Sequence, residues 1–128
     1  MRIDRLDHLV LTVRDIPTTL AFYEAVLGMK PVRFAADRWA LACGSQKLNL
    51  HQADRPVDPN VRHATPGSAD FCLVTATPLA QIMAELARHG VPVLLGPVRR
   101  TGAVGELESV YIYDPDENLV ELSNPVES

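Results

Sequence analysis

Residues 6–13 decide the fold, and they read Leu6-Asp7-His8-Leu9-Val10-Leu11-Thr12-Val13. Leu9, Leu11 and Val13 share one face of this stretch, and His8, Val10 and Thr12 share the other. This alternation is typical of a strand with one buried face. We expect an amphipathic helix next, because Asp15 can cap its start and Gly28 suits a left-handed cap at its end. The apolar residues between those caps recur at helical spacing; they are Ile16, Leu20, Tyr23 and Leu27.

The same pattern returns further along the chain. Residues 70–75 again predict a strand, Thr77 is expected to cap a second helix, and Pro78 to open it. Two pairs of matched positions share one offset of 62 residues: His8 with Asp70, and Gly28 with Gly90. The chain therefore contains one module used twice.

Each half then continues with stretches that read as strands. The predicted strands are residues 31–36, 39–43 and 46–52 in the first half, and 93–98, 109–113 and 118–123 in the second. Residues 96–105 look like an inserted loop, and residues 114–117, Asp-Pro-Asp-Glu, like a hairpin turn. Two βαβββ modules result, each with a helix backing a curled sheet.

The predicted fold class is therefore α+β, with two tandem βαβββ modules forming a cupped mixed sheet around a cavity. We expect a single domain over residues 1–128, made of modules 1–52 and 68–128. Residues 53–67, rich in Pro, Asp and Gly, are interpreted as the linker.

Composition limits the classes of function. Hydrophobic residues make up 47% of the chain, but no run has the roughly 18 consecutive apolar residues of a membrane span. The net charge of −4, with no basic run longer than Arg99-Arg100, argues against nucleic-acid binding. We expect a soluble, cytoplasmic protein. Cys43 and Cys72 are too few for a disulfide framework and are expected to be buried reduced thiols.

Four polar residues interrupt predicted strand faces: His8, His51, Asp70 and Glu121. A pseudo-twofold axis between the modules would bring their strands around one cavity, where nitrogen and oxygen donors could hold a divalent metal. Each residue also has an ordinary structural interpretation, as a surface, turn or edge-strand residue. Asn49 projects to the same strand face as His51, so either could point inward.

Arg99 and Arg100 lie beside a glycine-containing stretch, where an arginine could clamp a substrate carboxylate or phosphate. A solvated hairpin tip explains them equally well. Tyr111 and Tyr113 alternate on one strand face and could line a pocket. His63 and His89 look like surface residues.

The paired modules, residues 6–10 and the ending Tyr-Ile-Tyr-Asp-Pro-Asp-Glu-Asn-Leu-Val-Glu-Leu of residues 111–122 resemble the vicinal oxygen chelate superfamily. This group includes glyoxalase I, bleomycin-resistance proteins and extradiol dioxygenases. Residues 67–73 and 96–103 look more narrowly like the glyoxalase-domain-containing protein 5 branch, which also holds bacterial virulence-associated members.

The resemblance implies one divalent metal ion, Zn, Ni, Mn or Fe, bound by strands of both modules. His8 and Glu121 match the family's motif directly, whereas Asp70 stands where metal-binding relatives usually have His. The fourth ligand falls on Asn49 in one register and His51 in the other, and His51 is preferred as the better ligand. Glu117 replaces the family's usual turn glycine and is expected to adopt a positive φ.

By this resemblance, the protein is a metal-dependent lyase or isomerase of glyoxalase type, acting on a small oxygenated substrate through an enediolate. Glu121 is the expected ligand and base, with Arg99, Arg100 and Tyr111 as substrate contacts. Two alternatives stay open: an extradiol dioxygenase with Fe(II), and a metal-free ligand- or drug-binding module. The resemblance also implies a homodimer.

Overall fold

The computed structural model describes residues 1–127, which form two compact units. The first unit ends at Gly67 and the second begins at Ser68. Residues 53–67, predicted as a linker, belong to the first unit and contain turns and bends but neither helix nor strand.

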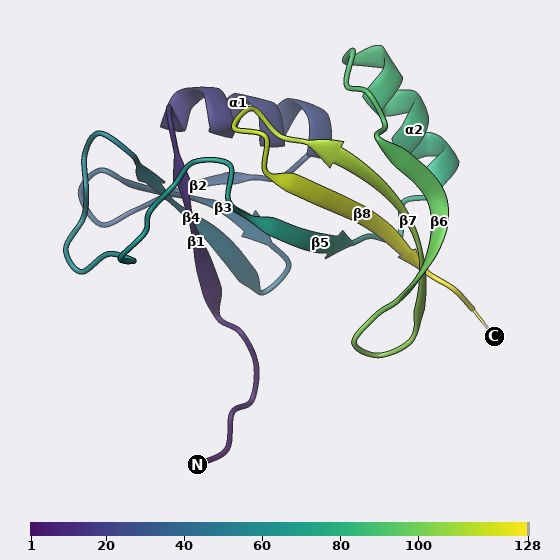
Figure 1. The fold of residues 1–128 in the computed structure, drawn as a ribbon, viewed down its shortest axis with the longest axis horizontal. Helices are drawn as coiled ribbons and strands as arrows, with labels where there is room; N and C mark the ends of the chain where they lie inside the picture. Colours follow the sequence, from purple (N-terminus) through teal and green to yellow (C-terminus); the bar gives the residue numbers. More distant parts are fainter. Residues whose placement is uncertain (128) are drawn as a thin grey trace. The chain divides into compact units, whose positions relative to one another are not determined.

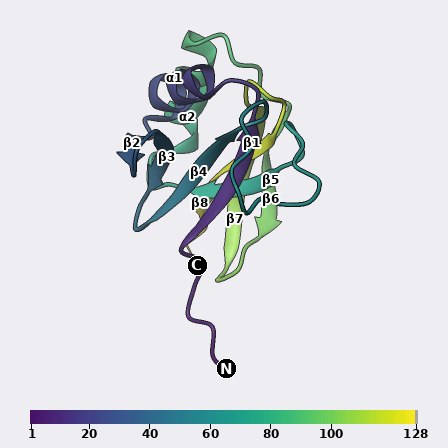
Figure 2. The same cartoon turned by 90° about the vertical axis from the view of Figure 1, so that its left-hand side faces the viewer.

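The first unit has the element order βαβββ, as predicted (Figure 1). Its elements are β1 (His8–Val13), α1 (Ile16–Leu27), β2 (Pro31–Phe34), β3 (Arg38–Cys43) and β4 (Gln46–Gln52). The strands lie in the order β1-β4-β3-β2, with β1 parallel to β4 and the other neighbours antiparallel. In Figure 2 the residues before β1 extend away from these strands.

The second unit repeats this topology in the order β5-β8-β7-β6, with β5 parallel to β8. Its elements are β5 (Asp70–Val74), α2 (Leu79–Arg88), β6 (Leu95–Thr101), β7 (Glu106–Tyr113) and β8 (Leu119–Pro125). The predicted class, α+β with two βαβββ modules that each form a mixed sheet, is thus confirmed. Within residues 1–127, neither helix is long and apolar enough to cross a membrane.

Each sheet has one face packed in a core and one open face, because strand side chains alternate. The buried apolar side chains are Leu11, Val13, Tyr23, Ala40, Leu41, Leu48 and Leu50 in the first unit, and Leu79, Leu86, Val110, Ile112, Val120 and Leu122 in the second. The intervening side chains, including His8, Asp70 and Glu121, lie on the open faces.

Helix α1 begins and ends as the sequence predicts. The Asp15 carboxylate accepts the Thr18 N–H at 3.0 Å, and this contact with Thr18 lowers the pKa of Asp15. Gly28 closes the helix with φ of 66°, in the left-handed region. Both ends satisfy backbone groups that a helix cannot pair internally.

Helix α2 is capped differently from the prediction, and the role given to Thr77 was wrong. Pro78 occupies the N-cap position and makes no side-chain cap. The Leu79 N–H instead donates to Asn124 Oδ1 at 2.9 Å, while Asn124 Nδ2 donates to the carbonyls of Thr75 and Thr77. A side chain distant in sequence replaces the local cap.

The predicted inserted loop over residues 96–105 was also wrong, because β6 extends to Thr101. The pairing of β6 with β7 shifts register between Leu95 and Val98. Gly96 lies there with φ of 119°, and a Cβ at this position would collide with the Ser109 carbonyl. The Gly-Pro pair marks a bulge within a strand rather than a loop.

The expectation of buried cysteines was wrong as well. Cys43 is half-buried at the end of β3, and Cys72 is exposed on the open face of its sheet. An apolar neighbourhood in sequence does not determine which face of a strand a residue takes.

The turn between β7 and β8 is held by buried polar side chains. Asp114 Oδ1 accepts the N–H groups of Asp116 and Asn118, and Asn118 Oδ1 accepts the Ala69 N–H at 2.9 Å. Glu117 adopts φ of 68°, as expected for a position where relatives use glycine. This turn is therefore tied to the residue that precedes Asp70.

We predict that Asn124→Ala lowers the free energy of unfolding by about 2 kcal/mol, because three hydrogen bonds to the start of α2 are lost. Asn124→Asp keeps the acceptor for Leu79 but sets a carboxylate oxygen against the carbonyls of Thr75 and Thr77, so it should also be less stable than the wild type. Urea unfolding followed by circular dichroism measures both. An Asn124→Ala protein as stable as the wild type would contradict this account.

Candidate functional site

His8 opens β1 and is oriented by its neighbour. Its Nδ1 lies 2.9 Å from Asp7 Oδ2, and this hydrogen bond lowers the pKa of Asp7. Because a carboxylate accepts, Nδ1 carries the hydrogen in the neutral ring and Nε2 keeps a free lone pair. Histidines that bind metals are commonly held by a carboxylate in this way.

The strand register decides which residues of β4 lie near His8. His8 is opposite Lys47, Asn49 is opposite Val10, and His51 is opposite Thr12. Asn49 is therefore displaced by two residues from His8, while His51 is displaced by four, or about 13 Å along the strand. The structure does not bring His8 and His51 together.

His51 has other partners. Arg38 Nη2 lies 3.2 Å from His51 Nε2, and His51 Nδ1 lies 3.4 Å from Asn60 Oδ1. An arginine can only donate, so Nε2 accepts in this contact. Both ring nitrogens of this buried histidine are engaged within the first unit.

Asn49 is buried but incompletely bonded. Its side chain is 5% exposed, and Oδ1 has no hydrogen-bond partner among residues 1–127. A buried carbonyl oxygen without a partner is costly unless a ligand or ion satisfies it. Asn49 therefore offers a metal ion an unpartnered donor atom, whereas both ring nitrogens of His51 already have partners.

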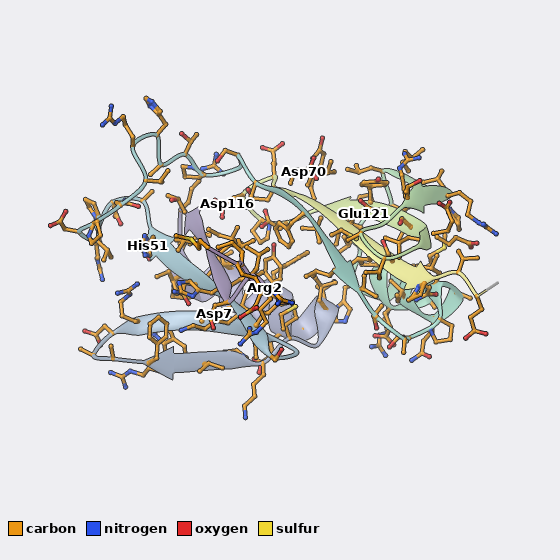
Figure 3. All side chains as sticks on the ribbon, turned by 90° about the horizontal axis from the view of Figure 1, so that it is seen from below. Arg2, Asp7, His51, Asp70, Asp116 and Glu121 are labelled. Atoms are coloured by element: carbon orange, nitrogen blue, oxygen red, sulfur yellow. The ribbon has the colours of Figure 1, made fainter. Side chains whose placement is uncertain are left out.

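The second unit places four of the predicted site residues around one cavity. The cavity, of about 390 Å³, is lined by Asp70, Leu94, Leu95, Arg100, Tyr111, Leu119 and Glu121. Figure 3 labels Asp70 and Glu121 on this unit, and Asp7 and His51 on the first. Two carboxylates, a guanidinium and a phenol thus line a space with apolar walls.

The two units share one register at their candidate ligands. Glu121 lies opposite Cys72, two residues beyond Asp70, just as Asn49 lies opposite Val10, two residues beyond His8. His8 and Asp70 are therefore equivalent, and so are Asn49 and Glu121. The internal repeat therefore extends to the candidate ligands.

The Glu121 carboxylate is held by two serines that the sequence analysis missed. Ser109 Oγ donates to Glu121 Oε2 at 2.7 Å, and Ser123 Oγ lies 3.4 Å from the same oxygen. Both serines are completely buried. Their only signal in the sequence is that they are small polar residues on strand positions in phase with Glu121.

Arg100 is fixed at the cavity by Tyr111. Its Nε donates to Tyr111 Oη at 2.8 Å, and its guanidinium carbon lies 5.4 Å from the centre of the tyrosine ring. Arg99 does not line the cavity, because adjacent strand side chains point to opposite faces. Of the two arginines considered, Arg100 alone is placed to meet a ligand there.

Cys72 adjoins Glu121 on the open face. Partial burial raises the pKa of the Cys72 thiol, and the Glu121 carboxylate acts in the same direction, because both disfavour a thiolate. The Ser123 hydroxyl, 3.1 Å from the sulfur, opposes this by hydrogen bonding. Cys72 is therefore kept as a protonated thiol.

The candidate donors are of kinds that bind divalent cations, but no three of them gather. Among residues 1–127 no group of three or more His, Cys, Asp or Glu is close enough to hold a metal ion. The first unit offers an imidazole nitrogen and an unpartnered amide oxygen, and the second offers two carboxylates beside a cavity. Nitrogen and oxygen donors of this kind suit Zn, Ni, Mn or Fe.

The family follows from comparison with known proteins. The Glyoxalase/Bleomycin resistance protein/Dioxygenase superfamily matches residues 5–122, so the chain belongs to this superfamily. This is the vicinal oxygen chelate superfamily that the repeated module and the C-terminal motif resemble.

Individual relatives cover nearly the whole chain. Virulence protein STM3117 of Salmonella typhimurium is 52% identical over 126 residues, covering 98% of this chain and 88% of the relative. Its crystal structure matches with a TM-score of 0.95, over 98% of this chain and 100% of that chain. Glyoxalase domain-containing protein RDO1 of Mycosarcoma maydis is 48% identical over 93% of this chain and 67% of its own length.

A more distant structure carries an enzyme's name. The lactoylglutathione lyase from Agrobacterium tumefaciens matches with a TM-score of 0.73 and 25% identity, over 96% of this chain and 95% of that chain.

We predict that Glu121→Gln speeds alkylation of Cys72 by iodoacetamide in chelator-treated protein at a fixed, mildly alkaline pH. Removing the neighbouring negative charge lowers the pKa of Cys72 toward its ordinary value, so more thiolate is present. A Cys43→Ala background isolates the signal. Glu108→Gln, whose side chain leaves the other face of β7, is the control and should not change the rate. A slower reaction in Glu121→Gln would show that the Glu121 carboxylate does not raise the pKa of Cys72.

Proposed function

We propose that the protein is a divalent-metal-dependent lyase or isomerase of glyoxalase type, acting on a small oxygenated substrate. The observation that carries this proposal is the cavity that brings Glu121, Asp70, Arg100 and Tyr111 together. Two carboxylates, a guanidinium and a phenol within apolar walls suit proton transfer on a small polar molecule.

His8, Asp70 and Glu121 are the proposed metal ligands, with the fourth donor from β4. The sequence favours His51 there, but the strand register and the unpartnered Oδ1 support Asn49. When bound, the ion stabilises negative charge that develops on adjacent substrate oxygens. Asp70 in place of the usual histidine makes the donor set richer in oxygen.

Glu121 is the proposed base. The Ser109 hydroxyl occupies Oε2, which leaves Oε1 to take a proton from a carbon beside a carbonyl and to return it to the neighbouring carbon. Arg100 and Tyr111 bind an anionic or carbonyl oxygen of the substrate, and the Tyr111 contact keeps the guanidinium at the cavity. Leu94, Leu95 and Leu119 give the cavity its apolar walls.

The names of two relatives support a narrower place within the superfamily. One is named a virulence protein and another a glyoxalase domain-containing protein, both close to half identical over more than nine-tenths of this chain. This supports membership of the glyoxalase-domain-containing protein 5 branch. We propose further that the partners are a small-molecule substrate and a second copy of the chain, with no nucleic acid or membrane involved.

We predict that the wild-type protein, dialysed against Ni, Zn, Mn or Fe(II), retains one of these metals in near-stoichiometric amount. Glu121→Gln should lose it, because a carboxylate ligand is replaced by a weaker neutral donor. Elemental analysis measures both. Retained iron would direct the activity assays to catechols and an extradiol dioxygenase. A wild-type protein that takes up none of the four metals would overturn the metal-dependent function and leave a ligand-binding module.

Asp7→Asn tests the role of His8 separately. It removes the carboxylate that orients the His8 ring, and we expect metal affinity to fall by about tenfold, as for other partners of ligating histidines. Asp4→Asn is the matched control, since Asp4 makes no hydrogen bond to His8. Isothermal titration with NiCl₂ compares them. Equal affinities of the two variants would show that Asp7 does not orient His8 for metal binding.

A further inference from the structure

Four side chains of the second unit form a continuous hydrogen-bonded row across β5, β8 and β7. Cys72 Sγ lies 3.1 Å from Ser123 Oγ, which lies 2.6 Å from Ser109 Oγ, and Ser109 Oγ lies 2.7 Å from Glu121 Oε2. Both serines are fully buried, while Cys72 is exposed. The row connects the exposed Cys72, through two buried serines, to the candidate base Glu121.

The carboxylate determines the direction of the bond that reaches it. An ionised carboxylate can only accept, so the Ser109 hydrogen points to Glu121. The Ser123 hydroxyl has one hydrogen and two acceptors within reach, Glu121 Oε2 at 3.4 Å and Ser109 Oγ at 2.6 Å. The closer contact, with Ser109, needs this hydrogen, because Ser109 has already given its own to Glu121. Cys72 Sγ, 3.1 Å from Ser123 Oγ, ends the row.

We propose that Ser109 is a positioning residue for the Glu121 carboxylate, and that Ser123 and Cys72 orient the Ser109 hydroxyl. The consequence for metal binding rests on the proposed function, in which Glu121 is a ligand. The positioning itself depends only on the second unit.

A second charge explains why such positioning is required. Arg100 lines the same cavity as Glu121, and an arginine and a carboxylate readily form a bidentate pair. Among the described residues Arg100 makes no ion pair with an acidic group and bonds to Tyr111 instead. With Oε2 held by Ser109, Glu121 is kept from turning to Arg100, and Oε1 stays available.

The test compares Ser109→Ala, Ser109→Cys and the wild type by calorimetric titration with NiCl₂ and by the visible absorption of the Co²⁺ forms. Ser109→Ala should weaken Ni²⁺ binding by about tenfold, the loss typical for a hydrogen bond to a charged group. It should also shift the Co²⁺ absorption bands, because the carboxylate geometry at the ion changes. Ser109→Cys, which retains a weak donor, should recover part of both.

Matched controls separate positioning from general destabilisation. Thr19→Val removes an equally buried hydroxyl from α1 of the first unit and should leave Ni²⁺ affinity unchanged. Cys72→Ala should weaken binding less than Ser109→Ala does, whereas Cys43→Ala should have no effect. Equal Ni²⁺ affinities and Co²⁺ spectra for Ser109→Ala and the wild type would overturn the proposal.

A measurement on metal-free protein keeps the two proposals apart. Side-chain ¹³C relaxation of Glu121 should differ between Ser109→Ala and the wild type, and Arg100→Gln added to Ser109→Ala, which removes the competing partner, should leave the carboxylate more mobile than in the wild type. If the wild type binds neither Ni²⁺ nor Co²⁺, the metal-dependent function fails, and this relaxation experiment alone decides the role of Ser109. Unchanged Glu121 mobility would then refute that role.

Discussion

The parallel pairing of the first and last strand in each unit is the constraint on which the candidate site depends. In the first unit, His8 lies two residues before Val10, which pairs with Asn49. In the second unit, Asp70 lies two residues before Cys72, which pairs with Glu121. A slip by one residue would turn every side chain of a strand to the other face and place the donors in the core. The hydrophobic alternation that builds the core therefore also fixes where the chemistry lies.

Polar groups beneath the open faces set the orientation of the site residues. In the second unit, serine hydroxyls satisfy the Glu121 carboxylate, and Tyr111 engages Arg100. In the first unit, Arg38 and Asn60 engage both nitrogens of His51, while the side-chain oxygen of Asn49 has no hydrogen-bond partner within residues 1–127. The two sheets share a topology, but they differ in which side chain remains available to a ligand.

The fold could be predicted from sequence because its signals are local and repeated. Strand alternation, helical spacing and the caps at Asp15 and Gly28 each depend on residues only a few positions apart. Because the pattern repeats at an offset of 62 residues, the elements predicted in one half can be compared with those in the other. Glu117 was likewise predictable, because the turn demands a positive φ whatever residue occupies it.

What could not be predicted depends on contacts between distant residues. The cap of α2 comes from Asn124, and the bulge at Gly96 depends on the backbone of Ser109. The choice between Asn49 and His51 needs the pairing of β1 with β4, because both residues share a strand face. Ser109 and Ser123 gain their meaning only from lying within hydrogen-bond distance of Glu121.

The buried turn between β7 and β8 has a consequence for how this sequence can change. Asn118 binds both Asp114 and the backbone of Ala69, so the hairpin turn and the entry to β5 form one hydrogen-bonded unit. A new turn sequence would alter the position of the Asp70 carboxylate as well as the shape of the hairpin. The loop and the Asp70 side chain are thus expected to evolve together, and an insertion at this hairpin would displace Asp70 before it weakened the sheet.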